Sequence, residues 1–224
     1  MPGSAPLKIT TRSGNVRVRA EPGAELEVVD GSIETRDDGT LHIRRLPSSS
    51  VIEVRCASGT EITVGTVSGK VELLGAFGTA RVATVSGRIR IEEVARLDLR
   101  TKSGTIDIGT CSDACRIMTK SSAVHVGRAG SATVAAVSGV VHLEHVDGAE
   151  VKTVSGKVVV GAGGKDRVSV HTVSGRVEIQ VPPATKPLAR LRSVSGHVQC
   201  DCPPGHDVEI AVVSVSGAVR VSSG

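Results

Sequence analysis

One short unit recurs along most of this sequence. It reads Thr-Val-Ser-Gly-x-Val with small variations, and clear copies begin at Thr66, Thr84, Thr153, Thr172 and Ser214. Weaker copies begin at Thr101, Thr119, Ala136 and Ser193. Successive copies are 17 to 21 residues apart. Self-similarity at a near-constant period is typical of repeat architectures, in which each unit stacks on the next.

Apolar residues hold fixed positions around the Ser of each unit. Six and four residues before Ser155 lie Ala149 and Val151, and three and five residues after it lie Val158 and Val160. The other units repeat this pattern, mostly with Val, Ile, Leu and Ala, and polar residues alternate with them. Alternation with period two and β-branched side chains indicate strands rather than helices. The inward parity changes at Ser-Gly, so we expect a corner there, where Gly tolerates positive φ.

These features predict an all-β fold, a single-chain parallel β-solenoid (β-helix) of about nine two-strand coils. At roughly 4.8 Å per coil, the stack would be about 40 Å long. The Thr or Ser two positions before each corner Ser would form an inward column of hydroxyls bonded to each other or to the corner backbone. Phe77 is the only aromatic residue, as expected for a thin interior.

Residues 1–50 do not fit the coil register, and we interpret them as an irregular β cap on a solenoid domain of residues 51–224. The expected cap strands are Leu7–Thr11, Asn15–Arg19, Glu25–Val29 and Thr40–Arg45. Because the sequence ends just after the strand around Val221, we expect the other end of the solenoid to be uncapped and to present an open edge.

Composition narrows the functional classes. The formal net charge is +4 without runs of like charge, and aromatic stacking platforms are missing, so nucleic acid is not expected as a partner. No apolar stretch approaches 18 residues, so direct membrane insertion is not expected either. The first residues lack the order of a secretory signal. We therefore expect a cytoplasmic protein, with a peripheral position at the cell envelope as the alternative.

The cysteines and histidines first suggest metal chemistry. His197, Cys200, Cys202 and His206 fall within ten residues. In the repeat register, however, Cys200 and Cys202 occupy core columns, as do Cys111 and Cys115, while Cys56 would take a Thr position. We expect all five to be small buried hydrophobes. A metal or redox role is the less favoured alternative.

His125 and His142 share an outward column in adjacent coils, with His145 nearby. Their rings could stack and form a weak metal or pH-sensitive patch, although a solvated surface is the favoured interpretation. The corner serines form a row rather than one special nucleophile, and no cluster of acids and bases stands out. No catalytic residue, cofactor site or metal site is predicted, and the chain is not expected to be an enzyme.

The position just before each corner Ser holds the candidate interaction site. By parity it faces outward, and in five consecutive units it is valine: Val137, Val154, Val173, Val194 and Val215. An exposed apolar strip usually marks a contact surface. The alternative is that the corner rotates these side chains inward.

The Thr-Val-Ser-Gly-x-Val pattern, the Pro203-Pro204-Gly205 loop and the irregular β cap resemble a bacterial family of domains of unknown function, described as β-strand-repeat proteins or "putative adhesins". The resemblance covers roughly residues 40–224. It implies a parallel β-solenoid without established enzymatic activity, and some relatives are associated with cell-envelope stress systems.

Two functions are therefore expected. The first is a non-enzymatic scaffold that binds a protein partner or copies of itself through the valines. The alternative is an envelope-associated, adhesin-like module that binds a glycan or a membrane protein.

Overall fold

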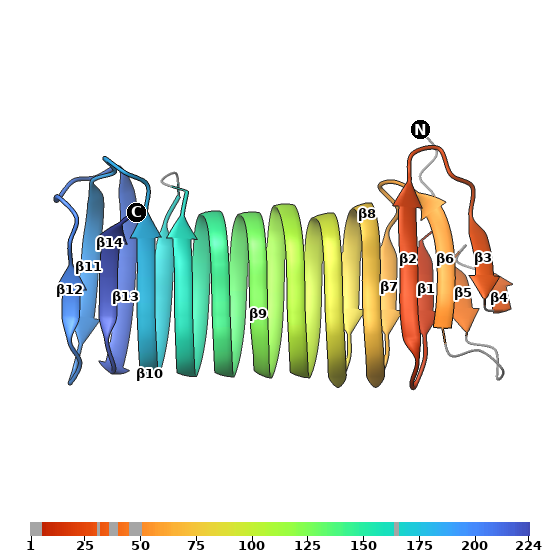
Figure 1. The fold of residues 1–224 in the computed structure, drawn as a ribbon, viewed down its shortest axis with the longest axis horizontal. Helices are drawn as coiled ribbons and strands as arrows, with labels where there is room; N and C mark the ends of the chain where they lie inside the picture. Colours follow the sequence, from red (N-terminus) through yellow and green to blue (C-terminus); the bar gives the residue numbers. More distant parts are fainter. Residues whose placement is uncertain (1–5, 31, 36–39, 45–50, 164–165) are drawn as a thin grey trace. The chain divides into compact units, whose positions relative to one another are not determined.

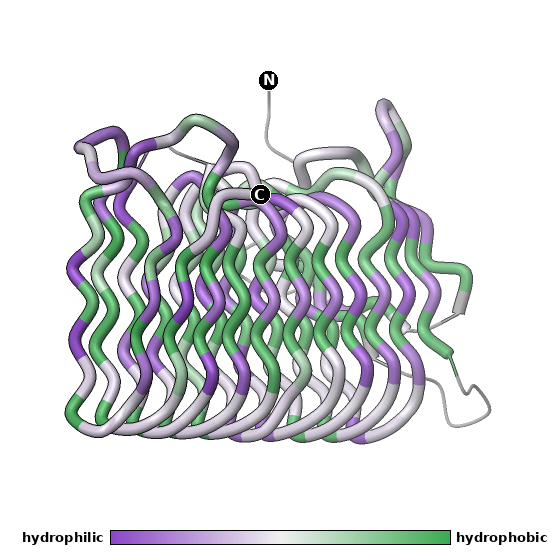
Figure 2. Tube along the Cα trace, turned by 60° about the vertical axis from the view of Figure 1, so that its left-hand side comes forward, coloured by the Kyte–Doolittle hydropathy of each residue, from purple (hydrophilic) through white to green (hydrophobic). Residues whose placement is uncertain are grey.

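The computed structural model describes residues 6–30, 32–35, 40–44, 51–163 and 166–224. The described residues form strands and no helix, and the fold is all-β and β-solenoid-like, as predicted. Contacts divide the chain into two compact units, Met1–Ser112 and Asp113–Gly224. Within each unit the chain winds through successive turns, and apolar and polar residues alternate along the strands (Figures 1 and 2).

The described residues of the first unit form eight strands and the start of a ninth. They are β1 (Leu7–Thr10), β2 (Asn15–Glu21), β3 (Glu27–Asp30), β4 (Ser32–Thr35), β5 (Leu41–Arg44), β6 (Val51–Ala57), β7 (Ile62–Gly65), β8 (Ser68–Ala83) and the first part of β9 (Ser86–Ala162). Strand β8 pairs with β9 in parallel, Ser on Ser and Gly on Gly, from Ser68↔Ser86 and Gly69↔Gly87 onward. This is the register that the repeat predicts.

The second unit contains the rest of β9, then β10 (Val168–Val181), β11 (Pro187–Ser193), β12 (Val198–Cys200), β13 (Val208–Ser216) and β14 (Val219–Ser223). All pairings among them that join separate strands are parallel. The predicted inward columns are buried, for example Val151, Val170 and Val212, which are 0% exposed.

Both conformation and space require the corner glycine at Gly69, Gly87, Gly104, Gly139, Gly156 and Gly217. Gly156 has φ of 131°, which L-residues rarely adopt, and a Cβ there would overlap the carbonyl oxygen of Gly139 in the neighbouring coil. The threonines of the Thr column are buried. In five coils the column hydroxyl donates to the corner carbonyl two residues on, as Thr153 Oγ1 does to Ser155 O at 3.1 Å. These five hydroxyls therefore bond to the corner backbone, one of the two arrangements expected, whereas Thr119 Oγ1 bonds to Ser122 Oγ.

The N-terminal strands require a correction. The four expected strands exist, although Arg45 lies outside the described residues, and β4 was not expected. The prediction that residues 1–50 depart from the coil register is wrong for β1 and β2. These strands pair in parallel with β7 and β8, as in Leu7↔Ile62 and Val16↔Val71. The segment Thr11–Val16 is another copy of the repeat, and an insertion after it had hidden the period.

Strand order is exchanged at the end of the sequence, which corrects a second expectation. Strands β13 and β14 do not form the outermost coil. They lie between β10 on one side and β11 and β12 on the other, and Figure 1 shows β11 and β12 outside them. The open edge belongs to residues 187–200, not to the last strand. The count of about nine coils and the domain limits at residues 50 and 51 stay predictions.

Candidate interaction surfaces

The five predicted valines line one surface of the second unit, which we call the valine strip (Val137, Val154, Val173, Val194 and Val215). Their side chains are exposed rather than rotated inward, with fractions of 46%, 49%, 49%, 83% and 48% in that order. Exposure follows from the strand geometry, because each valine stands between the position of the Thr column on one side, which is Ala136 before Val137, and the corner Ser-Gly on the other.

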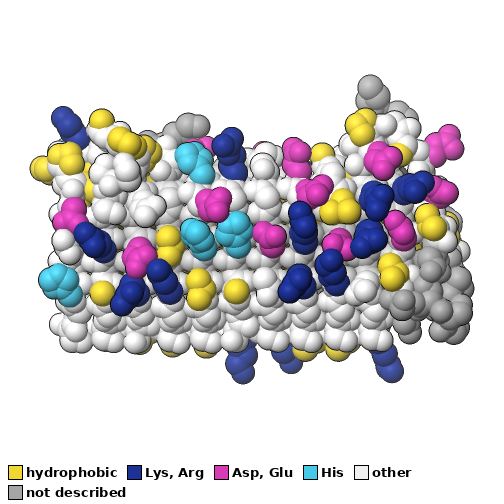
Figure 3. All heavy atoms as spheres, viewed as in Figure 1, with side chains coloured by type: hydrophobic (Ala, Val, Ile, Leu, Met, Phe, Trp, Pro, Cys, Tyr) yellow, Lys and Arg dark blue, Asp and Glu magenta, His cyan; other side chains and the backbone are white. Residues whose placement is uncertain are grey.

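The strip is continuous across five coils, four of its valines lying in strands and Val194 directly after β11. Ser174 is in register with Ser155 on one side and with Ser216 on the other, and Ser195 N donates to Val215 O. The valines therefore follow the order 137, 154, 173, 215 and 194, at roughly one strand spacing of about 4.8 Å. Lys120 occupies the same position one coil before Val137. On the face drawn in Figure 3, by contrast, acidic and basic side chains are mixed.

A polar hollow of about 680 Å³ lies on another surface of the second unit. Ser169 Oγ and His171 Nε2 are 3.2 Å apart, and Lys152 Nζ lies 2.6 Å from Glu150 Oε1. The hydrogen bond from Lys152 lowers the pKa of the Glu150 carboxyl below its usual range. The lining is polar apart from two small residues: Ser131, Thr133, Gly148, Ala149, Glu150, Asp166, Arg167, Ser169 and His171. Such a set of donors and acceptors suits a ligand rich in hydroxyl groups.

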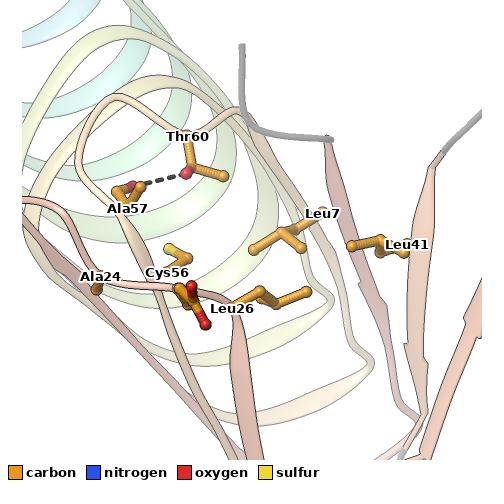
Figure 4. A pocket seen from close by; sticks show the side chains of 8 residues that line it. Leu7, Ala24, Leu26, Leu41, Cys56, Ala57 and Thr60 are labelled. Carbon is orange, nitrogen blue, oxygen red and sulfur yellow. Dashed lines mark hydrogen bonds between the residues drawn. The ribbon is translucent and has the colours of Figure 1, made fainter. Parts of the chain in front are cut away.

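An apolar pocket of about 280 Å³ lies in the first unit (Figure 4). It is lined by Leu7, Ala24, Glu25, Leu26, Leu41, Cys56, Ala57 and Thr60. Thr60 Oγ1 donates to Ala57 O at 2.6 Å, and burial raises the pKa of the Cys56 thiol. The thiol is thus protonated near neutral pH and behaves as part of the apolar wall.

The cysteine predictions are confirmed in part. Cys56, Cys111 and Cys115 are buried, although Cys56 pairs with Ala20 and does not occupy a Thr position. For Cys200 the prediction is wrong, because this residue is exposed, while Cys202 is half-buried. Cys200 does lie in the predicted column, opposite the fully buried Val221, but it belongs to the outer strand β12, which pairs only with β14 among the described residues.

The two column histidines are neighbours, as predicted. Their ring centroids are 5.5 Å apart in an edge-on arrangement, and His125 Nε2 lies 2.9 Å from Glu144 Oε1. Within the described ranges, no group of three His, Cys, Asp or Glu side chains is arranged to hold a metal ion.

Sequence reasoning missed both the polar hollow and the apolar pocket. Each depends on a turn that leaves the repeat pattern, around Gly23 in one case and before Arg167 in the other. The turn signals were visible in Glu21-Pro-Gly23 and in Gly161–Asp166, whose residues 164 and 165 lie outside the described part. Because these turns depart from the repeat, the repeat pattern does not predict which side chains come together beside them.

Comparison with known proteins settles the relationship. The model of the family described as Toastrack DUF4097 matches residues 5–221. The chain belongs to this family. No curated protein matches the sequence of this Toastrack chain.

Two solved structures share its fold. One is described as a "putative adhesin" from Parabacteroides distasonis ATCC 8503, with 12% identity, a TM-score of 0.56, and 97% of this chain and 93% of that chain covered. The other is a "putative adhesin" from Parabacteroides merdae ATCC 43184, with 12% identity, a TM-score of 0.52, and coverage of 98% and 92%. At this identity the likeness concerns the fold alone. Among the described residues, no helix has the length and apolar character needed to span a bilayer.

Proposed function

We propose that this Toastrack chain is a non-enzymatic interaction scaffold that associates with a second copy of itself through the valine strip. The proposal rests mainly on the valine strip itself. Its five valines lie side by side in neighbouring coils, and each exposes about half of its side chain or more. Two such rows have the same spacing, so the side chains of one can fit between those of the other, as in dry β-sheet interfaces.

The size of the strip sets the expected affinity. Burying the exposed half of ten valines, five from each copy, is worth on the order of 8 kcal/mol. Association costs about 4–15 kcal/mol in lost freedom. We therefore expect a weak, concentration-dependent dimer rather than a permanent one. The row of equivalent corner serines supports the non-enzymatic part of the proposal, since catalysis needs one distinctive nucleophile.

The test is sedimentation velocity over a wide concentration range. The unmodified protein should shift toward the dimer as concentration rises, and the double variant Val154→Lys with Val173→Lys should stay monomeric because it places four ammonium groups in the interface. The control is Val140→Lys with Ala218→Lys, which adds the same charge at exposed positions beyond the corner. A monomer at every concentration, unaffected by either double change, contradicts the proposal.

A second candidate is an adhesin-like module at the cell envelope, with a hydroxyl-rich glycan in the polar hollow. The hollow's lining favours it, and so do the descriptions of the two structural neighbours. A cytoplasmic location accompanies the first function and an envelope location the second. Without aromatic residues for stacking, binding would be weak. Titration with neutral oligosaccharides should show binding that Arg167→Ala abolishes and Arg176→Ala leaves intact, and equal responses of both variants contradict it.

A further inference from the structure

The outer coil of the second unit, formed by β11 and β12, has one uncovered side. Among the described residues, β11 pairs only with β13, and β12 pairs only with β14. The outer strands of the first unit, β5 and β6, are different, since each carries an antiparallel partner, β4 and β3 respectively. The outer main-chain groups of β11 are thus available to a further strand.

The inward side chains of this coil are incompletely covered. Ala189 and Leu191 are only half-buried, although their register partners Ile210 and Val212 are 0% exposed. The same contrast holds on the second side of the coil, where Cys200 is exposed and Val221 is fully buried. An added strand would complete the apolar layer that every inner coil already has.

A third observation concerns Ser193, which belongs to the column of inward hydroxyls. In the adjacent coil Ser214 Oγ donates to Ser216 O at 3.0 Å. Ser193 Oγ is buried but has no hydrogen-bond partner among the described residues. Buried hydroxyls are normally paired, so this side chain has bonding capacity that a neighbouring strand could use.

Charge determines which kind of strand fits. The outward positions of β11 include Arg190 and Arg192, both exposed. Arg190 lies 3.5 Å from Glu209, and Arg192 is opposite the apolar Val213. If two copies of β11 met edge to edge, arginines would face arginines, which is unfavourable for directly opposed side chains.

We propose that β11 accepts one extended segment of an acidic partner protein, in which carboxylate side chains alternate with small apolar ones. The carboxylates would lie beside Arg190 and Arg192, and the apolar residues would cover Ala189 and Leu191. A hydroxyl residue at the next inward position would meet Ser193. This is addition of a strand to an open sheet edge, in which the main chain provides affinity and alternate side chains provide selectivity. The proposed site is the free main-chain edge of β11, whereas the valine strip is a row of side chains next to the corners.

The register defines a probe peptide, Thr-Glu-Val-Glu-Val-Glu-Thr, blocked at both ends. Two control peptides separate the contributions: one replaces each Glu with Lys, and one replaces each Val with Pro, which keeps the charge but removes two amide donors. Binding to the full chain is measured by NMR titration, and amide hydrogen exchange of residues 188–193 is measured with and without peptide.

We expect the acidic peptide to bind about tenfold or more tightly than either control peptide. It should also slow amide exchange in β11. The double variant Arg190→Glu with Arg192→Glu should prefer the lysine peptide instead. The matched control, Lys152→Glu with Arg176→Glu, changes the net charge equally at exposed positions away from β11 and should keep the preference for the acidic peptide.

Three results would overturn the proposal. The first is equal affinity for the acidic and lysine peptides in the unmodified protein. The second is equal affinity for the proline peptide, which would mean simple charge attraction without strand pairing. The third is that the control variant, Lys152→Glu with Arg176→Glu, loses its preference for the acidic peptide as completely as the β11 variant does. None of these measurements depends on self-association, so the proposed dimer and the strand site can fail independently.

Discussion

At the scale of single residues, Glu72 in β8 is the most strongly engaged carboxylate among the described ion pairs. It is 8% exposed and lies opposite Arg17 of β2. Its Oε2 accepts from Arg17 Nη2 at 3.0 Å, and its Oε1 lies 2.6 Å from Lys70 Nζ. The bond from Lys70, more than the opposing burial, lowers the pKa of Glu72 below its ordinary value of 4.5.

Replacing this carboxylate should therefore destabilise the protein in a pH-dependent way. A lowered folded-state pKa stabilises the fold above the unfolded-state pKa and ceases to do so as pH falls through the folded-state value. We expect Glu72→Gln to cost about 1 kcal/mol at pH 7, with the difference from the unmodified protein shrinking below about pH 4.5. Urea denaturation at pH 7 and pH 3 measures it.

The control is Glu178→Gln, which removes a more exposed partner of Lys157. Its effect at pH 7 should be smaller than that of Glu72→Gln. A penalty for Glu72→Gln that is as large at pH 3 as at pH 7 would show that the side chain acts through packing and not through its charge.

At the scale of the strand and corner, the inward hydroxyls provide a matched pair. Thr153 Oγ1 donates to Ser155 O, whereas Thr172 Oγ1 in the next coil is buried without a partner among the described residues. The two residues are in register, at 8% and 6% exposure. A buried hydroxyl contributes to stability only when its hydrogen bond is made.

Valine has nearly the same shape as threonine but lacks the hydroxyl, so a Thr→Val substitution tests the hydrogen bond of that hydroxyl. We expect Thr153→Val to cost about 1 kcal/mol, and Thr172→Val to be neutral or stabilising by up to about 1 kcal/mol. Thermal unfolding of both variants at one pH provides the comparison. Equal losses for the two would show that the Thr172 hydroxyl is bonded in solution.

This scale also shows how far the sequence could predict the structure. The inward columns and the corners followed from alternation, since strand geometry sends successive side chains to opposite faces. Whether the valines before each corner face outward was left open by the sequence, and their exposure is a finding of the structure. The order of the strands at the end of the sequence could not be predicted from this alternation. The position of β11 outside β13 depends on the loops around Pro183 and Pro204, and nothing in the repeat specifies which of two similar coils stacks first. For the same reason the exposure of Cys200 was missed.

At the scale of the whole molecule, each unit is a stack in which a coil contacts mainly its immediate neighbours. In such repeat proteins, stability is approximately a sum of coil and nearest-neighbour contributions. A local defect should therefore weaken the coils beside it more than distant ones.

Gly156→Ala creates such a defect, because it forces a Cβ against Gly139 O at a φ of 131°. We expect a loss of about 3 kcal/mol or more. Amide hydrogen exchange should accelerate in β10 and β13 of the second unit and remain unchanged in β2 and β6 of the first. Gly23→Ala is the control, with φ of 72° and open space around the new Cβ, and should cost only about 1–2 kcal/mol. Uniform acceleration in both units would mean that the chain unfolds as one cooperative block.

The exchanged strand order has a consequence for biosynthesis. Residues 208–223 emerge from the ribosome after β10 and β11, yet they must insert between those two strands. Coils up to β10 can wind in the order in which they are translated. Residues 187–200 can reach the pairing of the complete structure only after the final strands have been made. We therefore expect a chain truncated before residue 208 to leave β11 without its sheet partner β13.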